Sequence, residues 1–146
     1  MSKTTVEPYL TFSGRCDEAL EFYKSAIGAQ VVMVMRFDES PDPVPEGMLQ
    51  PGFEKKIMHA AFKVGDSLIM ASDGCDGKSK FDGFSLSISL ADEEAANKYF
   101  AALGEGGKVT MPLGKTFWSP LFGMVEDRFG VNWMINVCDP NAQGCV

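Results

Sequence analysis

The order of apolar patterns along the chain repeats once, and this repeat limits the fold more than any other feature. Strand-like and helical patterns follow one another as strand, helix and three strands, over residues 6–12, 14–28, 29–37 and 55–72. The same order returns over residues 84–90, 93–104, 108–112 and 122–137. A shift of about 77 positions lays Phe22 on Tyr99 and Tyr23 on Phe100. The sequence therefore predicts two β-α-β-β-β modules, residues 1–78 and 79–146, within one compact domain.

Capping and turn residues lie at the ends of these patterns. Asp92 precedes the second helical pattern, where an aspartate side chain caps a helix, and Gly28 and Gly104 are expected to end the two helices. Gly65 and Asp66 fit a tight hairpin turn. Asp127 and Gly130 fit the turn of a closing hairpin that includes Arg128.

One helix per module covers only one face of its sheet, so the other face must meet something else. We expect an α+β fold in which two modules form a cupped mixed sheet with the helices on its outer face. The faces without helices then line a cup, and small ligands bind preferentially in such concave sites.

The charge of the chain narrows the range of partners. Its 146 residues are 45% apolar, which is sufficient for a core, and its net charge is −7. This charge repels nucleic acid and anionic lipid, so we expect neither as a partner. The stretch “MSKTTVEPYL” lacks the apolar segment of a signal peptide and no apolar run could span a bilayer, so a cytoplasmic location is expected.

The cysteines form no metal-binding or redox pattern. They are scattered, and no Cys-x-x-Cys pair occurs among Cys16, Cys75, Cys138 and Cys145. We expect free thiols in a reducing compartment. The phosphate loop, the dinucleotide-binding glycine pattern and the Gly-x-Ser-x-Gly elbow are also absent.

Three stretches carry a resemblance to a known superfamily: “PYLTFSGRCDEALEFYKSAIGA”, “KIMHAAFKVGDSLIMASD” and “FWSPLFGMVEDRFGVNWMINV”. Together they resemble the vicinal oxygen chelate superfamily of glyoxalase I, dioxygenases and bleomycin-resistance proteins, and within it the PhnB-like group. The resemblance implies paired β-α-β-β-β modules, a cupped sheet and a homodimer. It also carries the label of a demethylubiquinone methyltransferase, which we discount because the chain lacks the parallel sheet and glycine turn of a doubly wound methyl-donor site.

In metal-using members, the resemblance implies that ligands come from the first and last strand of each module. The corresponding positions are near Pro8, Met70, Ser85 and Met134. Hard divalent cations need oxygen or imidazole donors, which proline and methionine cannot supply. We therefore expect neither a metal site of the glyoxalase type nor another cofactor.

Strand alternation predicts which side chains face the cup. It places His59 there with Ile57 and Ala61, opposite the helix-facing Phe62. From the second module it adds Ser85, Ser87, Asn132 and Met134. A shift of one residue in register would invert each assignment.

His59 is the only histidine, and histidine is the residue type that exchanges protons near neutral pH. It is a candidate general base or solitary ligand. The alternative is a half-buried histidine whose hydrogen bonds are satisfied by a cross-strand partner. Asp73, Glu126 and Asp127 are possible companions in space, although Asp73 and Asp127 fit turns better.

Trp118 lies in the loop before the closing hairpin, where its ring could cap the mouth of the cup with support from Phe117 and Phe122. Packing in the core or in a dimer interface is an equal alternative. For the run “VVMVMRF” we expect a place in the core, although methionines also suit an adaptable apolar wall.

Three classes of function remain open. The first is a small-molecule-binding protein whose acidic charge favours a neutral or cationic guest. The second is an enzyme of the lyase, isomerase or dioxygenase type, metal-dependent or assisted by His59, acting on a small organic substrate. The third is a structural or interaction protein, for which the loop 38–53, stiffened by four prolines including Pro43, could brace a dimer or cover a cup.

Overall fold

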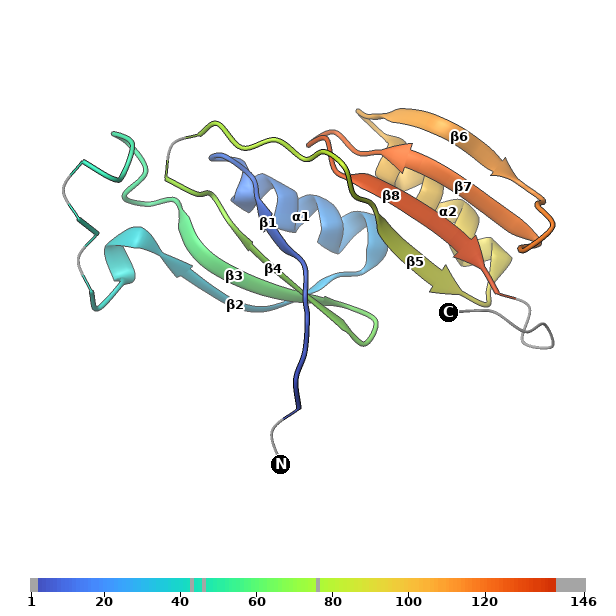
Figure 1. The fold of residues 1–146 in the computed structure, drawn as a ribbon, viewed down its shortest axis with the longest axis horizontal. Coiled ribbons are helices and arrows are strands. Elements are labelled where there is room, and N and C mark those ends of the chain that lie inside the picture. Colours follow the sequence, from blue (N-terminus) through green and yellow to red (C-terminus); the bar gives the residue numbers. More distant parts are fainter. Residues whose placement is uncertain (1–2, 43, 46, 76, 139–146) are drawn as a thin grey trace. The chain divides into compact units, whose positions relative to one another are not determined.

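The computed structural model describes residues 3–42, 44, 45, 47–75 and 77–138, and its elements repeat in the predicted order (Figure 1). The first set comprises β1 (Tyr9–Thr11), α1 (Cys16–Ile27), β2 (Gln30–Arg36), the short 3-10 helix η1 (Phe37–Glu39), β3 (Ile57–Val64) and β4 (Ser67–Ser72). The second comprises β5 (Leu86–Leu90), α2 (Glu93–Gly104), β6 (Lys108–Gly114), β7 (Leu121–Glu126) and β8 (Asn132–Val137).

The chain divides into two compact units, unit 1 (Met1–Lys80) and unit 2 (Phe81–Val146). Each holds one four-stranded mixed sheet, in the order β1-β4-β3-β2 in unit 1 and β5-β8-β7-β6 in unit 2. The first strand of each unit pairs with the last in parallel, and the remaining pairs are antiparallel. The expected α+β class with duplicated β-α-β-β-β units is confirmed.

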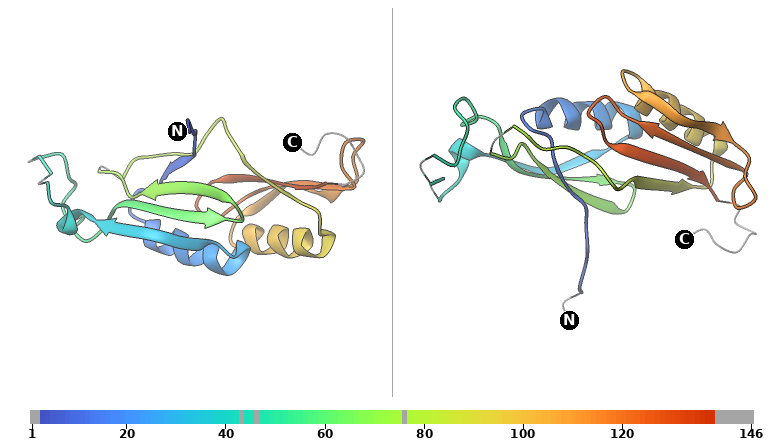
Figure 2. Two further views of the ribbon diagram at one scale, coloured as in Figure 1. Left: turned by 90° about the horizontal axis from the view of Figure 1, so that it is seen from below. Right: turned by 45° about the horizontal axis from the view of Figure 1, so that its top comes forward.

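In unit 1, α1 packs against β2 and β3, and Figure 2 shows it lying along one face of the sheet. Apolar residues at helical spacing, among them Ala19, Leu20 and Tyr23, are buried. The Tyr23 ring stacks on that of Phe62 at a centroid distance of 5.8 Å, so Phe62 points from β3 toward the helix. Gly28 ends α1 in the left-handed conformation at φ 67°, as expected.

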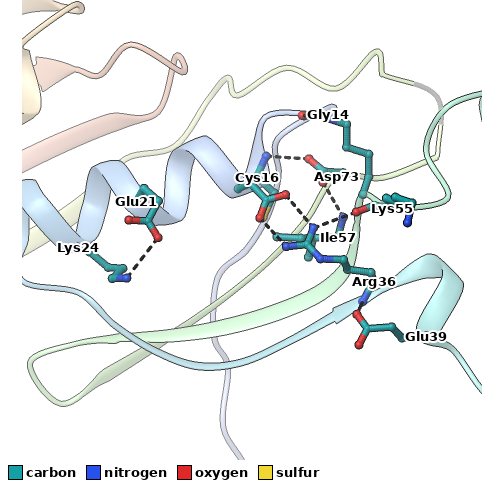
Figure 3. A network of polar contacts seen from close by, with 11 residues as sticks. Gly14, Cys16, Glu21, Lys24, Arg36, Glu39, Lys55, Ile57 and Asp73 are labelled. Atoms are coloured by element: carbon teal, nitrogen blue, oxygen red, sulfur yellow. Dashed lines mark hydrogen bonds and ion pairs between the residues drawn. The ribbon is translucent and has the colours of Figure 1, made fainter.

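A polar network holds the beginning of α1 to the sheet (Figure 3). The buried Asp73 carboxylate accepts hydrogen bonds from the backbone N–H groups of Cys16, at 2.7 Å, and Ile57, at 2.8 Å. Arg36 donates two hydrogen bonds of 2.8 Å to the Asp17 carboxylate and a third to the Lys55 carbonyl. The start of the helix, the end of β2 and the start of β3 are therefore joined at one point.

In unit 2, α2 packs against β6, β7 and β8. Asp92 caps this helix, because its side chain accepts a hydrogen bond from the N–H of Glu94. Trp133, Ile135 and Val137 alternate into the core from β8 and are at most 3% exposed. The expected alternation in this strand is confirmed.

The two expected hairpin turns are also present. Val64 pairs with Ser67 across Gly65 and Asp66. In the closing hairpin, the buried Asp127 accepts hydrogen bonds from the N–H groups of Phe129 and Val131, and from the indole N–H of Trp133. Asp127 therefore shapes the turn and also anchors a core side chain, which the sequence did not indicate.

Two expectations were wrong. The run “VVMVM” of β2 is not in the core: β2 is an edge strand, and Val32 is 57% exposed. Cys16 and Cys75 are free, whereas Cys138 is disulfide-bonded. Cys145 and Pro43 lie outside the described residues. Of the helices in the described ranges, none has the length and apolar character needed to cross a membrane.

Candidate functional site

Each sheet has a face turned away from its own helix, which we call the helix-free face. Because Phe62 points toward α1, its β3 neighbours Ala61 and His59 belong to the helix-free face of unit 1. Met70 is the register partner of Ala61, and Tyr9 is the register partner of Met70, so both lie on the same face.

On this face the hydroxyl of Tyr9 lies 3.1 Å from Nδ1 of His59, within hydrogen-bonding distance. The two rings are tilted, with their centroids 5.6 Å apart. Tyr9 belongs to β1 and His59 to β3, so the phenol reaches across β4. The structure therefore places His59 on the expected face and gives it a partner that the sequence analysis did not consider.

A row of side chains crosses the helix-free face of each sheet at the same level. In unit 1 the register aligns Met33, Ala61, Met70 and Tyr9 across β2, β3, β4 and β1. In unit 2 it aligns Met111, Met124, Met134 and Ser87 across β6, β7, β8 and β5. The methionines of β2 and β4 thus recur in β6 and β8, so the repeat extends from the fold to its helix-free surface.

The expected site residues of unit 2 are partly brought together. Ser87 and Met134 are direct register partners. Asn132 lies two residues before Met134 on β8, on the same face, and pairs with Glu126. Ser85 precedes β5 and is not in the sheet, so Ser87 is the serine that the strand positions beside Met134.

Trp118 lies between β6 and β7 and is 52% exposed. Its ring meets those of Phe117 and Phe122 edge-on, at centroid distances of 4.8 and 5.2 Å, as expected for mutual support. Phe122 pairs with Asn136, which places both on the helix-free face. The hydroxyl of Ser119 has the carbonyls of Leu121 and Val137 within hydrogen-bonding distance, at 2.9 and 2.8 Å, and so holds the loop to the sheet.

One polar atom beside this aromatic group is unsatisfied. The side-chain oxygen of Asn136 is buried and has no hydrogen-bond partner among the described residues. An unpaired buried acceptor lowers stability. Sequence patterns do not show whether such an oxygen has a donor.

The positions that the resemblance assigns to metal ligands carry mainly soft or uncharged side chains. The register pairs Met70 with Tyr9 and Met134 with Ser87, whereas the carbonyl of Pro8 accepts a hydrogen bond from the N–H of Met70. These side chains are two thioethers, a phenol and an alcohol, whereas the imidazole of His59 and the carboxylate of Glu126 lie elsewhere on the helix-free faces. Within the described ranges, no three His, Cys, Asp or Glu side chains are grouped so that they could hold a metal ion.

The other reactive groups near α1 have structural roles. Both oxygens of Asp73 are occupied by backbone N–H groups, so this carboxylate is not the companion of His59. Burial raises the pKa of the Cys16 thiol far above its ordinary value, and the charge of Asp73 raises it further, which disfavours the thiolate form. The hydrogen bonds from Arg36 lower the pKa of Asp17.

Comparison with known proteins shows a family. Residues 4–136 match the family described as 3-demethylubiquinone-9 3-methyltransferase. The chain is 36% identical over 140 residues to Protein YjdN of Escherichia coli, with 90% of this chain and 94% of the relative covered.

Two solved structures are similar along almost their whole length. Protein PA1353 of Pseudomonas aeruginosa has 39% identity and a TM-score of 0.80, with 93% of this chain and 98% of that chain covered. A protein of Bacillus cereus, described as a putative 3-demethylubiquinone-9 3-methyltransferase and PhnB protein, has 26% identity and a TM-score of 0.72, with 92% and 100% covered.

At the level of fold alone, a glyoxylase/bleomycin resistance protein/dioxygenase domain from Frankia has a TM-score of 0.62 at 13% identity, with 95% of this chain and 100% of that chain covered. The duplicated unit, with its helix on one face and its first strand parallel to its last, is thus shared with that superfamily. The chain belongs to the PhnB-like family described as 3-demethylubiquinone-9 3-methyltransferase, and its fold is that of the vicinal oxygen chelate superfamily.

Proposed function

We propose that this protein binds a small organic molecule at its helix-free sheet faces, without a metal site of the glyoxalase type. The observation that carries the proposal is the matched pair of methionine-bearing rows, Met33 and Met70 in unit 1 and Met111 and Met134 in unit 2. Methionine side chains are flexible and polarizable, so they form apolar walls that adapt to a guest.

Polar groups beside these rows supply orientation. They are the Tyr9–His59 pair in unit 1, and Ser87 and Asn132 in unit 2. Mostly apolar walls with a few polar groups are typical of small-molecule sites. Trp118 adds an exposed aromatic surface. The net charge of −7 favours a neutral or cationic guest over an anion.

The family description names a methyl transfer, and we do not extend that activity to this chain. Nucleotide-derived methyl donors bind doubly wound folds at the carboxyl ends of a parallel sheet. In each sheet here, two of the three strand pairs are antiparallel. A binding function agrees better with this architecture.

The second candidate function is an enzyme in which His59 acts on the bound molecule. It is favoured by the 3.1 Å contact between Tyr9 and His59, because a catalytic histidine is commonly held by a partner at its second nitrogen. The protonation of His59 distinguishes this role from binding.

The proposal includes a homodimer, as implied by the family resemblance. Its support is β2, the edge strand of the unit 1 sheet among the described strands, where four consecutive apolar residues from Val31 to Val34 are exposed. Free edges with apolar side chains associate unless they are covered. We expect about twice the chain mass of 15.9 kDa by sedimentation equilibrium.

Thermal unfolding with a library of small organic molecules tests the binding function. A guest that binds the native state raises the unfolding temperature, so we expect members of the library to raise it by several degrees. We also expect Met134→Gln to remove this increase, because the amide makes the wall polar at similar volume. The control is Met48→Gln, the same substitution at an exposed loop residue.

Two outcomes would contradict the proposal. One is a library in which every compound leaves the unfolding temperature unchanged. The other is an increase of several degrees with micromolar zinc, nickel or manganese alone, since it would reveal a divalent cation bound by the native state.

A further inference from the structure

The imidazole of His59 has one hydrogen-bond partner among the described residues, the hydroxyl of Tyr9 at Nδ1. The register partner of His59 on β2 is Met35. Met70 of β4 is the register partner of Tyr9. The second ring nitrogen, Nε2, therefore has no partner within the part of the chain that the structure describes. The ring lies beside Met35, and its protonation decides what Nε2 can bind.

The chemistry of the two groups indicates which one donates. The nitrogen lone pair of a neutral imidazole is a strong acceptor, whereas the lone pairs of a phenol oxygen are partly delocalised into its ring. The favourable arrangement has the Tyr9 O–H donating to Nδ1 of His59. A neutral imidazole carries a single proton, so that proton must then be on Nε2.

We propose that Tyr9 holds His59 as an Nε2–H donor, so that the helix-free face of unit 1 binds a neutral organic molecule through an acceptor oxygen such as a ketone carbonyl. This inference rests on the proposed binding function and adds the class of guest. Tyr9 is a positioning residue, since it acts through His59.

The apolar surroundings explain why an acceptor is required. A guest that packs against Met35 and Met70 removes water from the neighbouring Nε2–H group. A donor without an acceptor then opposes binding, whereas an oxygen on the guest restores the hydrogen bond. Anionic oxygens are disfavoured by the net charge of −7, which leaves neutral acceptors such as carbonyl groups.

The assignment also bears on catalysis. A general base needs a free lone pair at the nitrogen that faces the substrate. With its proton on Nε2, neutral His59 polarises an acceptor oxygen and does not remove a proton there. The opposite tautomer, with the proton on Nδ1 and donated to the Tyr9 oxygen, would make Nε2 the base required by the enzymatic alternative.

NMR of the single histidine tests the tautomer directly. Nitrogen–proton correlation spectra of the imidazole, at a pH where the ring is neutral, report which nitrogen carries the proton, and with one histidine they need no assignment. We expect the Nε2–H pattern in the native protein. Tyr9→Phe should shift the Nδ1 resonance, because it removes the donor, and Tyr99→Phe in α2 is the matched control that should leave it unchanged.

A pair of probes tests the class of guest. Acetophenone and ethylbenzene share a carbon skeleton and differ by one carbonyl oxygen. We expect acetophenone to bind about fivefold more tightly, as one hydrogen bond provides, and to shift the Nε2–H resonance, which ethylbenzene should not do. In Tyr9→Phe this preference should decrease, because without the phenol donor the proton exchanges between Nε2 and Nδ1.

The outcomes separate this inference from the proposed function. An Nδ1–H pattern in the native protein overturns the tautomer and favours the enzymatic alternative. Equal affinity for the two probes overturns the requirement for an acceptor while leaving small-molecule binding intact. If neither probe binds, the result counts against the proposed function itself, and the Nδ1 shift on Tyr9→Phe still decides the role of Tyr9.

Discussion

At the scale of single residues, buried carboxylates in this protein serve the backbone. Asp73 accepts hydrogen bonds from Cys16 and Ile57, and Asp127 accepts them from its own turn and from Trp133. Turn shaping was the expected role of both carboxylates. It is confirmed for Asp127, which accepts hydrogen bonds within its own turn. Asp73 instead joins the start of α1 to the start of β3.

Replacing Asp73 with asparagine tests its role at the start of α1. The amide group would point a donor at a backbone N–H that now has an acceptor, so we expect a loss of about 2 to 3 kcal/mol in the free energy of unfolding. Urea denaturation followed by circular dichroism measures the loss. Asp82→Asn, at an exposed loop position, should change this free energy by less than about 0.5 kcal/mol. Equal effects of the two substitutions would show that the hydrogen bonds of Asp73 are not important for stability.

At the scale of elements, a glycine sets how closely α2 approaches its sheet. Gly123 lies on the helix-facing side of β7, opposite Ile135. A Cβ atom at this position would lie 2.8 Å from the Phe100 side chain and 2.9 Å from that of Leu113. Both separations are shorter than van der Waals contact, so the helix packs where a side chain of the sheet would otherwise be.

Gly123→Ala should therefore destabilise unit 2. The added methyl group must displace Phe100 and Leu113, and overpacking of this kind costs about 1 to 3 kcal/mol. Gly114→Ala in the neighbouring strand β6 is the matched control, because a Cβ atom there meets nothing within 4 Å. Urea denaturation of both variants measures the difference. A Gly123→Ala variant as stable as Gly114→Ala would mean that α2 shifts at no cost.

At the scale of the whole molecule, each of the two units has its own sheet, helix and buried residues. Mutations in separate units with no shared contacts affect stability independently. Asp73→Asn and Gly123→Ala act on different units, so their effects should be separable within one chain.

Hydrogen exchange measured peptide by peptide tests this independence. Asp73→Asn should lower the protection of amides in α1 and β3 and leave those of β7 and β8 unchanged, because local opening reports local stability. Gly123→Ala should show the reverse pattern. A uniform loss of protection along the chain in either variant would show that the two units unfold as one.

Much of the fold could be predicted because it depends on local patterns. Apolar residues at every second position predict a strand and show which of its side chains share a face. Apolar residues spaced by about 3.6 positions predict a helix. Such local patterns predict the duplicated order of elements, the Asp92 cap and the end of α1 at Gly28. The same alternation placed His59, Ser87 and Met134 on the faces where the structure has them.

The candidate site depended on pairing between distant segments, which local patterns do not contain. Tyr9 contacts His59 across 50 positions and over an intervening strand, so only the order β1-β4-β3-β2 brings them together. The same order makes β2 an edge strand and exposes a run that its composition assigned to the core. The sequence by itself thus determined the two units and the faces of their strands. The tertiary structure decided which side chains meet on those faces, because strand order and register are set by the packing of the whole sheet.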